Sequence, residues 1–206
     1  MHVRQRVMSY PGGGRNRRRR SRGGMLIEVL VSIVISSIAL LALAGVNASA
    51  VRYTKMSQYR ATATLLVSDL AERMRANKGL AVAGGVAATG FFAGAYDYSS
   101  TDFAGQATPA SLPAELCNTA ASSCTSQLIA DLDMAQWRLL VRTQLPEGSI
   151  FIARQAGQTA ADVWVAWRDP AVANNDESPA LATECPDGLN LNDDRSVRCS
   201  YFRINL

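Results

Sequence analysis

The sequence predicts an α+β protein, in which one long N-terminal helix precedes a small C-terminal head with an antiparallel sheet. Two observations predict this arrangement. Residues 24–78 keep a helical pattern without a proline, and the first half of that pattern is almost entirely apolar. Further along the chain, a short helical segment and three strand-like runs are separated by turn residues.

The positive charge of the chain is concentrated at its N-terminus. The 206 residues carry a formal net charge of +4, but residues 1–23 contain eight arginines and no acid. Removing these eight from 21 basic residues leaves 13 against 17 acidic ones, so the remainder is mildly acidic. The overall charge therefore does not indicate nucleic-acid binding. The run Arg17–Arg20 alone is also typical of a nucleic-acid or nuclear-import patch, but its closeness to an apolar segment favours a role in membrane orientation.

The apolar segment is long enough to cross a membrane. Val29–Val51 is a stretch of 23 residues without a charge. A hydrocarbon core of about 30 Å needs about 20 residues of helix. Because the arginines precede this segment, the positive-inside bias keeps the N-terminus in the cytoplasm and exports the C-terminal part. We therefore expect a single-pass membrane protein whose C-terminal part is exported.

Two simpler interpretations of this segment leave Glu28 unexplained. A general secretory signal has an apolar region of about 7–15 residues before an A-x-A cleavage site. Ala42-Leu43-Ala44 and Ala48-Ser49-Ala50 fit such a site, but the apolar region is too long and Glu28 stands at its start. A plain single-pass anchor fits the length. However, a carboxylate at the edge of a hydrocarbon-embedded helix is costly and should have a partner.

A third interpretation explains both the leader and the acid. The string Arg22-Gly23-Gly24-Met25-Leu26-Ile27-Glu28 resembles the prepilin peptidase motif of type IV pilins and type II secretion pseudopilins. The resemblance implies a pilin-like fold, cleavage by prepilin peptidase between Gly23 and Gly24, removal of residues 1–23 and N-methylation of the new terminus. Glu28 then becomes the fifth mature residue, as in the family, whereas Gly24 stands where the family usually has Phe. The resemblance also implies that the membrane is the bacterial inner membrane and that the head is periplasmic.

Glu28 would serve assembly in such a protein. Cleavage leaves a positively charged α-amino group at the end of an apolar helix. A carboxylate from a neighbouring subunit can neutralise that charge, and the low dielectric makes the pairing selective for register. We therefore expect Glu28 to pair with a neighbour's N-terminus.

The helical pattern continues beyond the apolar segment. One face repeats at steps of three and four residues: Met56, Tyr59, Ala63, Leu66, Leu70 and Met74. Asn77-Lys78-Gly79 supplies a stop. The predicted organisation is a leader over 1–23, a helix over 24–78 about 80 Å long, and a head over 79–206.

The head contains one predicted helix and three predicted strands. Ala81–Pro113 reads as a long connection with isolated aromatic anchors. The helix covers Leu128–Leu145 and ends before Pro146-Glu147-Gly148. The strands are Ser149–Arg154, Asp162–Arg168 and Ser196–Leu206. The three tryptophans are expected to pack in the core and on the sheet: Trp137, Trp164 and Trp167.

Four cysteines lie in the exported part, which indicates disulfides. Four cysteines allow three pairings, and proximity in sequence favours Cys117–Cys124 and Cys185–Cys199. The second pair would close a C-terminal loop, as in many pilins. A zinc site made of all four cysteines is the alternative, but the spacing contains no C-x2-C pair.

The sequence predicts no catalytic residues and no cofactor. The only histidine is His2, so residues 24–206 lack Ser-His and Cys-His catalysis and His-ligated metals. Some pseudopilins bind calcium near the C-terminus, and the weak candidates here are Asp187, Asn190, Asn192 and Asp194. Asx turns in a solvated loop are the favoured interpretation. A membrane-anchored periplasmic enzyme using carboxylates is a distant alternative.

Three later segments narrow the resemblance. Leu70–Asn77, Leu145–Gly148 and Val163–Arg168 look like the PilV group of minor pilins, the type IV pilus modification proteins. That resemblance implies a minor pilin that helps start pilus assembly in a priming or tip complex. Its implied partners are other minor and major pilins and the inner-membrane assembly platform, and it reaches the cell surface in the pilus. A minor pseudopilin of a type II secretion system is the close alternative.

Overall fold

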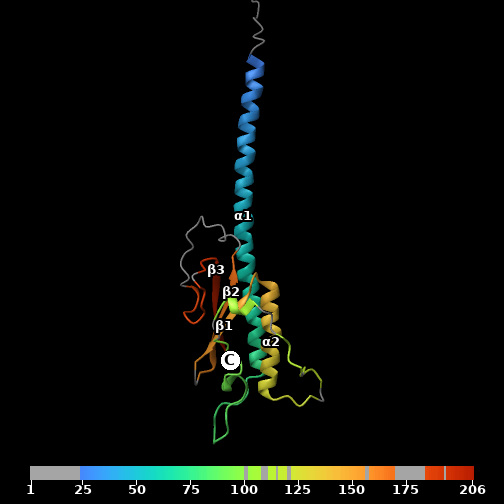
Figure 1. Ribbon diagram of the computed structural model, residues 1–206, viewed down its shortest axis with the longest axis vertical. Coiled ribbons are helices and arrows are strands. Elements are labelled where there is room, and N and C mark those ends of the chain that lie inside the picture. The colour runs from blue at the N-terminus through green and yellow to red at the C-terminus, as the bar shows by residue number, and fades with distance from the viewer. Residues whose placement is uncertain are drawn as a thin grey trace, which may run out of the picture. The chain divides into compact units, whose positions relative to one another are not determined.

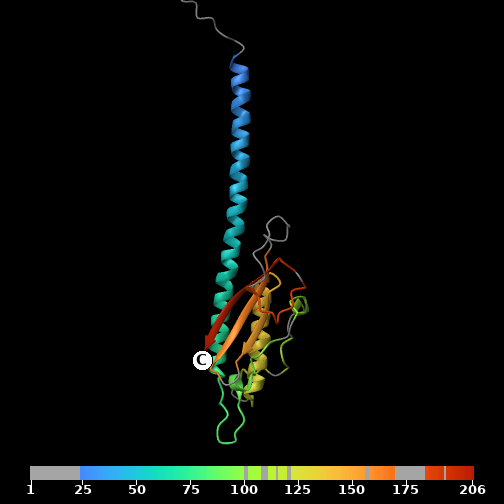
Figure 2. The same cartoon turned by 90° about the vertical axis from the view of Figure 1, so that its left-hand side faces the viewer.

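The structure is a computed structural model of the chain, shown in Figures 1 and 2. It describes residues 24–99, 102–107, 111–114, 116–119, 122–155, 158–169, 184–192 and 194–206. The chain divides into two compact units, one up to Ser49 and one from Ala50 onward, and each is treated by itself below.

Helix α1 covers Gly24–Ala76, 53 residues without a break. In the first unit its apolar side chains are exposed, from Leu26 at 74% to Leu41 at 73%. In the second unit the same helix has a buried face, made by Ala63, Leu66, Val67, Leu70, Ala71 and Met74. The predicted period is therefore confirmed, and the helix supplies core residues to the head.

The predicted stop after α1 is confirmed, two residues earlier than expected. The Asn77 backbone N–H closes the last turn on the Arg73 carbonyl at 3.1 Å. Gly79 then adopts a φ of 74°, a left-handed conformation that glycine allows. A Cβ at Gly79 would lie 2.1 Å from the Thr89 carbonyl oxygen. Only glycine therefore lets the backbone at residue 79 come this close to the backbone at Thr89.

Helix α2 covers Ser126–Gln144, close to the predicted range. Its N-cap is Thr125, whose hydroxyl accepts a hydrogen bond from the Leu128 N–H. The buried face includes Trp137, which is fully buried and donates its indole N–H to the Leu66 carbonyl of α1 at 2.7 Å. Leu140 belongs to the predicted helix pattern but is 38% exposed.

The sheet has three antiparallel strands in the order β1-β2-β3: β1 over Ser149–Arg154, β2 over Ala160–Arg168 and β3 over Val197–Asn205. Figure 1 labels the three strands, and Figure 2 shows them from the side. Because strand side chains alternate between faces, each strand contributes to two clusters. The predicted α+β class and antiparallel sheet are confirmed.

The two faces of the sheet are covered differently. One face packs against α1 and α2 and contains the fully buried Trp167 and Val163. The opposite face carries Phe151 and Trp164, which pack against Phe103 and the segment around Leu189. The predicted packing of the tryptophans is confirmed, with Trp164 on the face away from the helices.

Candidate functional site

Glu28 lies in the second turn of α1. Gly23 and the leader fall outside the described residues, and Gly24 is the first residue of the helix. The expected cleavage point therefore lies directly before the first described residue of α1. Among the residues that the structure describes, no side chain forms a hydrogen bond or ion pair with the Glu28 carboxylate.

Three of the serines that follow Glu28 are hydrogen-bonded within the helix itself. Ser32 donates its hydroxyl to the Glu28 carbonyl at 2.7 Å, and Ser37 donates to the Ile33 carbonyl at 2.7 Å. Ser49 donates in the same way to Gly45 at 3.2 Å. Such bonds let a hydroxyl enter hydrocarbon without an unpaired donor. The carboxylate of Glu28 is the one charged side chain between Gly24 and Val51, so in hydrocarbon it would need an outside partner.

Within the described ranges, α1 is the one helix long and apolar enough to cross a membrane by length and composition. A helix of this kind fits a single-pass membrane anchor. The head that follows carries two disulfides, which fits an oxidising compartment.

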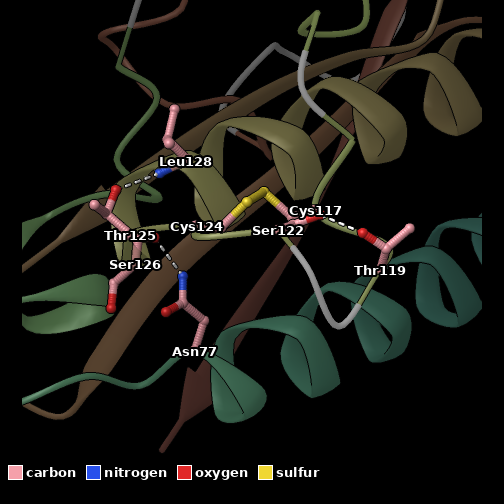
Figure 3. Close-up of a disulfide and its surroundings, with 8 residues drawn as sticks. All are labelled: Asn77, Cys117, Thr119, Ser122, Cys124, Thr125, Ser126 and Leu128. Carbon is pink, nitrogen blue, oxygen red and sulfur yellow. Dashed lines mark hydrogen bonds between the residues drawn. A yellow bond between two sulfur atoms is a disulfide. The ribbon is translucent and has the colours of Figure 1, made fainter.

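The disulfide Cys117–Cys124 joins the two ends of the loop that leads into α2 (Figure 3). Beside it, the hydroxyls of Thr119 and Ser122 share a hydrogen bond of 2.8 Å. On the other side of the same helix start, Asn77 donates its amide to the Ser126 carbonyl at 2.7 Å. The bridge therefore stabilises the point where α2 begins next to the end of α1.

The disulfide Cys185–Cys199 joins the C-terminal loop to β3. Cys199 is buried and belongs to the cluster around Phe151 and Leu189. Gly188 lies so close to Phe151 that a Cβ there would be 2.7 Å from the ring. Both cysteine pairs favoured by proximity are present, and the second holds its loop against the sheet.

The four calcium candidates have different surroundings. Asn190 and Asn192 hydrogen-bond to each other, as Asx turns do. Asp194 accepts hydrogen bonds from Arg168 and Ser196, and Asp187 is exposed. In the parts of the chain that the structure describes, no group of three or more His, Cys, Asp or Glu side chains could hold a metal.

Arg168, which the sequence did not single out, holds the end of β2 to two loops. Its Nε donates to Glu147 at 2.7 Å, and its Nη1 donates to Asp194 and to the Ser196 hydroxyl. The hydrogen bond from Arg168 lowers the pKa of Glu147. Burial would raise the pKa of Asp194, but the hydrogen bonds from Ser196 and Arg168 outweigh it and lower that pKa.

These two carboxyl groups predict a pH-dependent stability. A carboxyl group whose folded-state pKa is lowered stabilises the fold above its unfolded pKa and loses that effect as the pH falls through the folded value. We therefore expect Arg168→Gln to cost about 1 kcal/mol at pH 7, because the groups are partly exposed, and less at pH 2. Urea unfolding of the full chain in detergent, at both pH values, measures this. Arg195→Gln, which changes an exposed neighbouring arginine, is the control and should change the free energy of unfolding equally at pH 7 and pH 2. If Arg168→Gln also cost the same at both pH values, the prediction would be contradicted.

A second polar cluster, also missed by the sequence, joins the end of α1 to α2. Tyr96 is 1% exposed and donates its hydroxyl to Asp133 at 2.7 Å. Arg73 donates to the same carboxylate at 3.1 Å, and Asn77 donates to the Tyr96 oxygen. Burial and the bond to Asp133 raise the pKa of Tyr96. All groups are paired, so this cluster fixes packing and offers no reactive group.

Comparison of the chain with family models, with curated proteins and with solved structures gives no match. The chain has one long N-terminal helix, apolar in its first half, followed by a small α+β head with a three-stranded antiparallel sheet and two disulfides.

Proposed function

We propose that this chain is a minor type IV pilin, which helps start pilus assembly together with other minor pilins. In this proposal prepilin peptidase removes residues 1–23, the apolar half of α1 sits first in the inner membrane and later in the filament, and the head is periplasmic. The observation that carries the proposal is Glu28, a carboxylate without a described partner on an exposed apolar helix that begins at Gly24.

Three features support the proposal together. The helix is unbroken from the expected cleavage point to the head, so one element can serve both membrane and filament. Glu28 is the one charged side chain between Gly24 and Val51, so it is the group that needs an ionic partner in a membrane or a filament. The head is held by two disulfides, which fits an exported domain in an oxidising compartment.

N-terminal sequencing of the mature protein tests the proposal. The full chain is expressed in bacterial cells with and without prepilin peptidase, and the membrane fraction is analysed. We expect the peptidase to give a protein that begins at Gly24, and its absence to leave the leader attached. A mature protein that begins after Ala44 or Ala50, or that keeps residues 1–23 in the presence of the peptidase, would overturn the proposal.

The same material distinguishes a pilus from a type II secretion system. A minor pilin should co-purify with the major pilin after mild crosslinking, and it should occur in pili sheared from the cell surface. A secretion pseudopilin should instead co-purify with secretion subunits and be missing from sheared pili.

A further inference from the structure

The two edges of the sheet differ in how their backbone groups are satisfied. On the outer edge of β1, Ile152 exchanges two hydrogen bonds with Tyr98, at 2.9 and 3.0 Å. Its neighbour along that edge, Ile150, is bonded at both its N–H and its C=O by the side-chain amide of Gln106, at 3.0 and 2.8 Å. The buried Gln106 thus takes the place of a further strand. This edge is closed.

The direction of the backbone groups on β3 follows from its two ends. The Leu206 N–H bonds to the Thr159 carbonyl at 2.8 Å, and the Asp169 N–H bonds to the Ser196 carbonyl at 2.8 Å. The register between β2 and β3 is continuous between these points. Because hydrogen-bonded pairs alternate in an antiparallel ladder, the even-numbered residues of β3 bond to β2. The odd-numbered residues therefore direct their N–H and C=O groups outward.

Among the described residues, none bonds to the outward groups in the middle of β3. Cys199, Tyr201 and Arg203 have no backbone hydrogen bond on this side to any residue in the described part of the chain. At the strand's end, Arg75 of α1 donates to the outward Asn205 carbonyl at 3.5 Å, which agrees with the assigned direction. Pro and Gly, which often protect an edge, are absent from β3.

The open edge has space beside it and distinct chemistry on each side. A hollow of about 560 Å³ is lined by Cys199, Ser200 and Tyr201 of β3 together with Arg60, Asp162, Trp164 and Glu184. On the face away from the helices, the ring of Tyr201 is half exposed and lies 5.0 Å from that of Trp164. On the helix side, Arg60 and Arg75 of α1 flank β3.

Each of the two arginines on the helix side is paired with an exposed carboxylate. Arg60 is 3.8 Å from Glu184, and their side chains are 54% and 42% exposed. Arg75 pairs with Glu72, whose side chain is 75% exposed. Exposed pairs of this kind contribute little and exchange partners readily. The edge thus combines unpaired backbone groups, an aromatic face and exchangeable arginines.

We propose that the outer edge of β3 binds an extended, acidic segment of a partner protein, which adds to the sheet as a fourth strand. A residue of the added strand that lies opposite Tyr201 has its side chain on the same face of the sheet as Tyr201. Apolar side chains at such positions of the partner would therefore contact Tyr201 and Trp164. The alternate side chains point to the helix side, where acidic groups meet Arg60 and Arg75. This inference does not depend on the proposed function, because every residue used lies in the unit from Ala50 onward.

Peptide binding to the full chain in detergent tests the proposal. The probe is a fluorescent seven-residue peptide of alternating valine and glutamate, with a valine–lysine peptide as its charge control. We expect saturable binding of the first peptide and at least tenfold weaker binding of the second. N-methylation of the valines, which face β3 in an antiparallel addition, should abolish binding, whereas N-methylation of the glutamates should leave it unchanged.

Two matched variants distinguish the contribution of the Tyr201 backbone N–H to peptide binding from that of its side chain. Tyr201→Pro removes an outward N–H that the β2–β3 ladder does not use, so the sheet should persist. Tyr201→Ala removes the same side chain and keeps that N–H. We expect at least tenfold weaker peptide binding for Tyr201→Pro than for Tyr201→Ala, with the near-ultraviolet circular dichroism of the tryptophans as the check of folding.

Amide exchange of the unmodified chain gives a second measurement that needs no variant. The N–H groups of Tyr201 and Arg203 should exchange faster than those of Ser200 and Phe202, and should become protected when the peptide binds. Equal exchange at all four positions, equal loss of binding on methylation of either set, or the absence of saturable binding would overturn the proposal. Self-association of the chain through β3 would also overturn it, because the occupant would then be a second copy.

Discussion

Glu28→Gln is expected to abolish incorporation of this protein into pili while cleavage after Gly23 continues. Glutamine keeps the size and hydrogen-bonding capacity of the side chain but removes the charge that would neutralise a neighbour's N-terminal ammonium. Breaking a buried ion pair by removing one partner costs about 3–5 kcal/mol. A loss of that size at each subunit contact should leave the variant in the membrane fraction.

The measurement compares two fractions of the same cells. Immunoblots of sheared pili report incorporation, and N-terminal sequencing of the membrane fraction reports cleavage. Glu28→Asp, which keeps the charge, should retain partial incorporation. Ser32→Ala is the matched control, because its hydroxyl bonds only to the Glu28 carbonyl one turn away. Normal incorporation of Glu28→Gln would show that the carboxylate has no part in assembly, even where cleavage at Gly23 is correct.

Trp137→Ala is expected to cause the largest loss of stability in the head. Trp137 lies on the buried face of α2 and is fully buried in the core. Its indole N–H donates a hydrogen bond to the Leu66 carbonyl of α1 at 2.7 Å. Truncation of a buried tryptophan to alanine costs about 3–5 kcal/mol through lost burial and the cavity that remains. We therefore expect a clear fall in the urea midpoint of the full chain in detergent.

Near-ultraviolet circular dichroism is the suitable signal, because Trp164 and Trp167 remain in the variant and report the packing of the sheet. Leu140→Ala is the matched control on the same helix, since Leu140 is 38% exposed. It should lower the free energy of unfolding by less than about 1 kcal/mol. If both variants lost the same stability, α2 would not be packed through Trp137 as the structure has it.

Much of the fold was predictable because it depends on local patterns. The 3.6-residue period of α1, with Leu70 and Met74 on one face, has a single interpretation as a helix. In the run Asp162–Arg168 apolar residues alternate along the chain, which predicts a strand. In the structure both faces of that strand are covered, to different degrees. The disulfides were predictable from proximity, since short loops bring Cys117 and Cys124 together at small entropic cost.

The interactions that the sequence missed all join residues distant in the chain. Arg168 meets Glu147 and Asp194 only because a turn and a disulfide-closed loop converge on the end of β2. The connection after α1 read as a loop with isolated anchors, yet Tyr96 in it is a buried core residue. No spacing rule in one sequence indicates such pairs, because their partners lie in other elements.

The sequence by itself determined the apolar helix and the charge at Glu28 and favoured the disulfide pairs, since each depends on neighbouring residues and on the bilayer or compartment around them. Only the tertiary structure decided that Gln106 closes the edge of β1 while β3 stays open. The physical reason is that an edge is defined by hydrogen bonds between segments: Gln106 reaches Ile150 across 44 residues, and that contact exists only once the chain has folded.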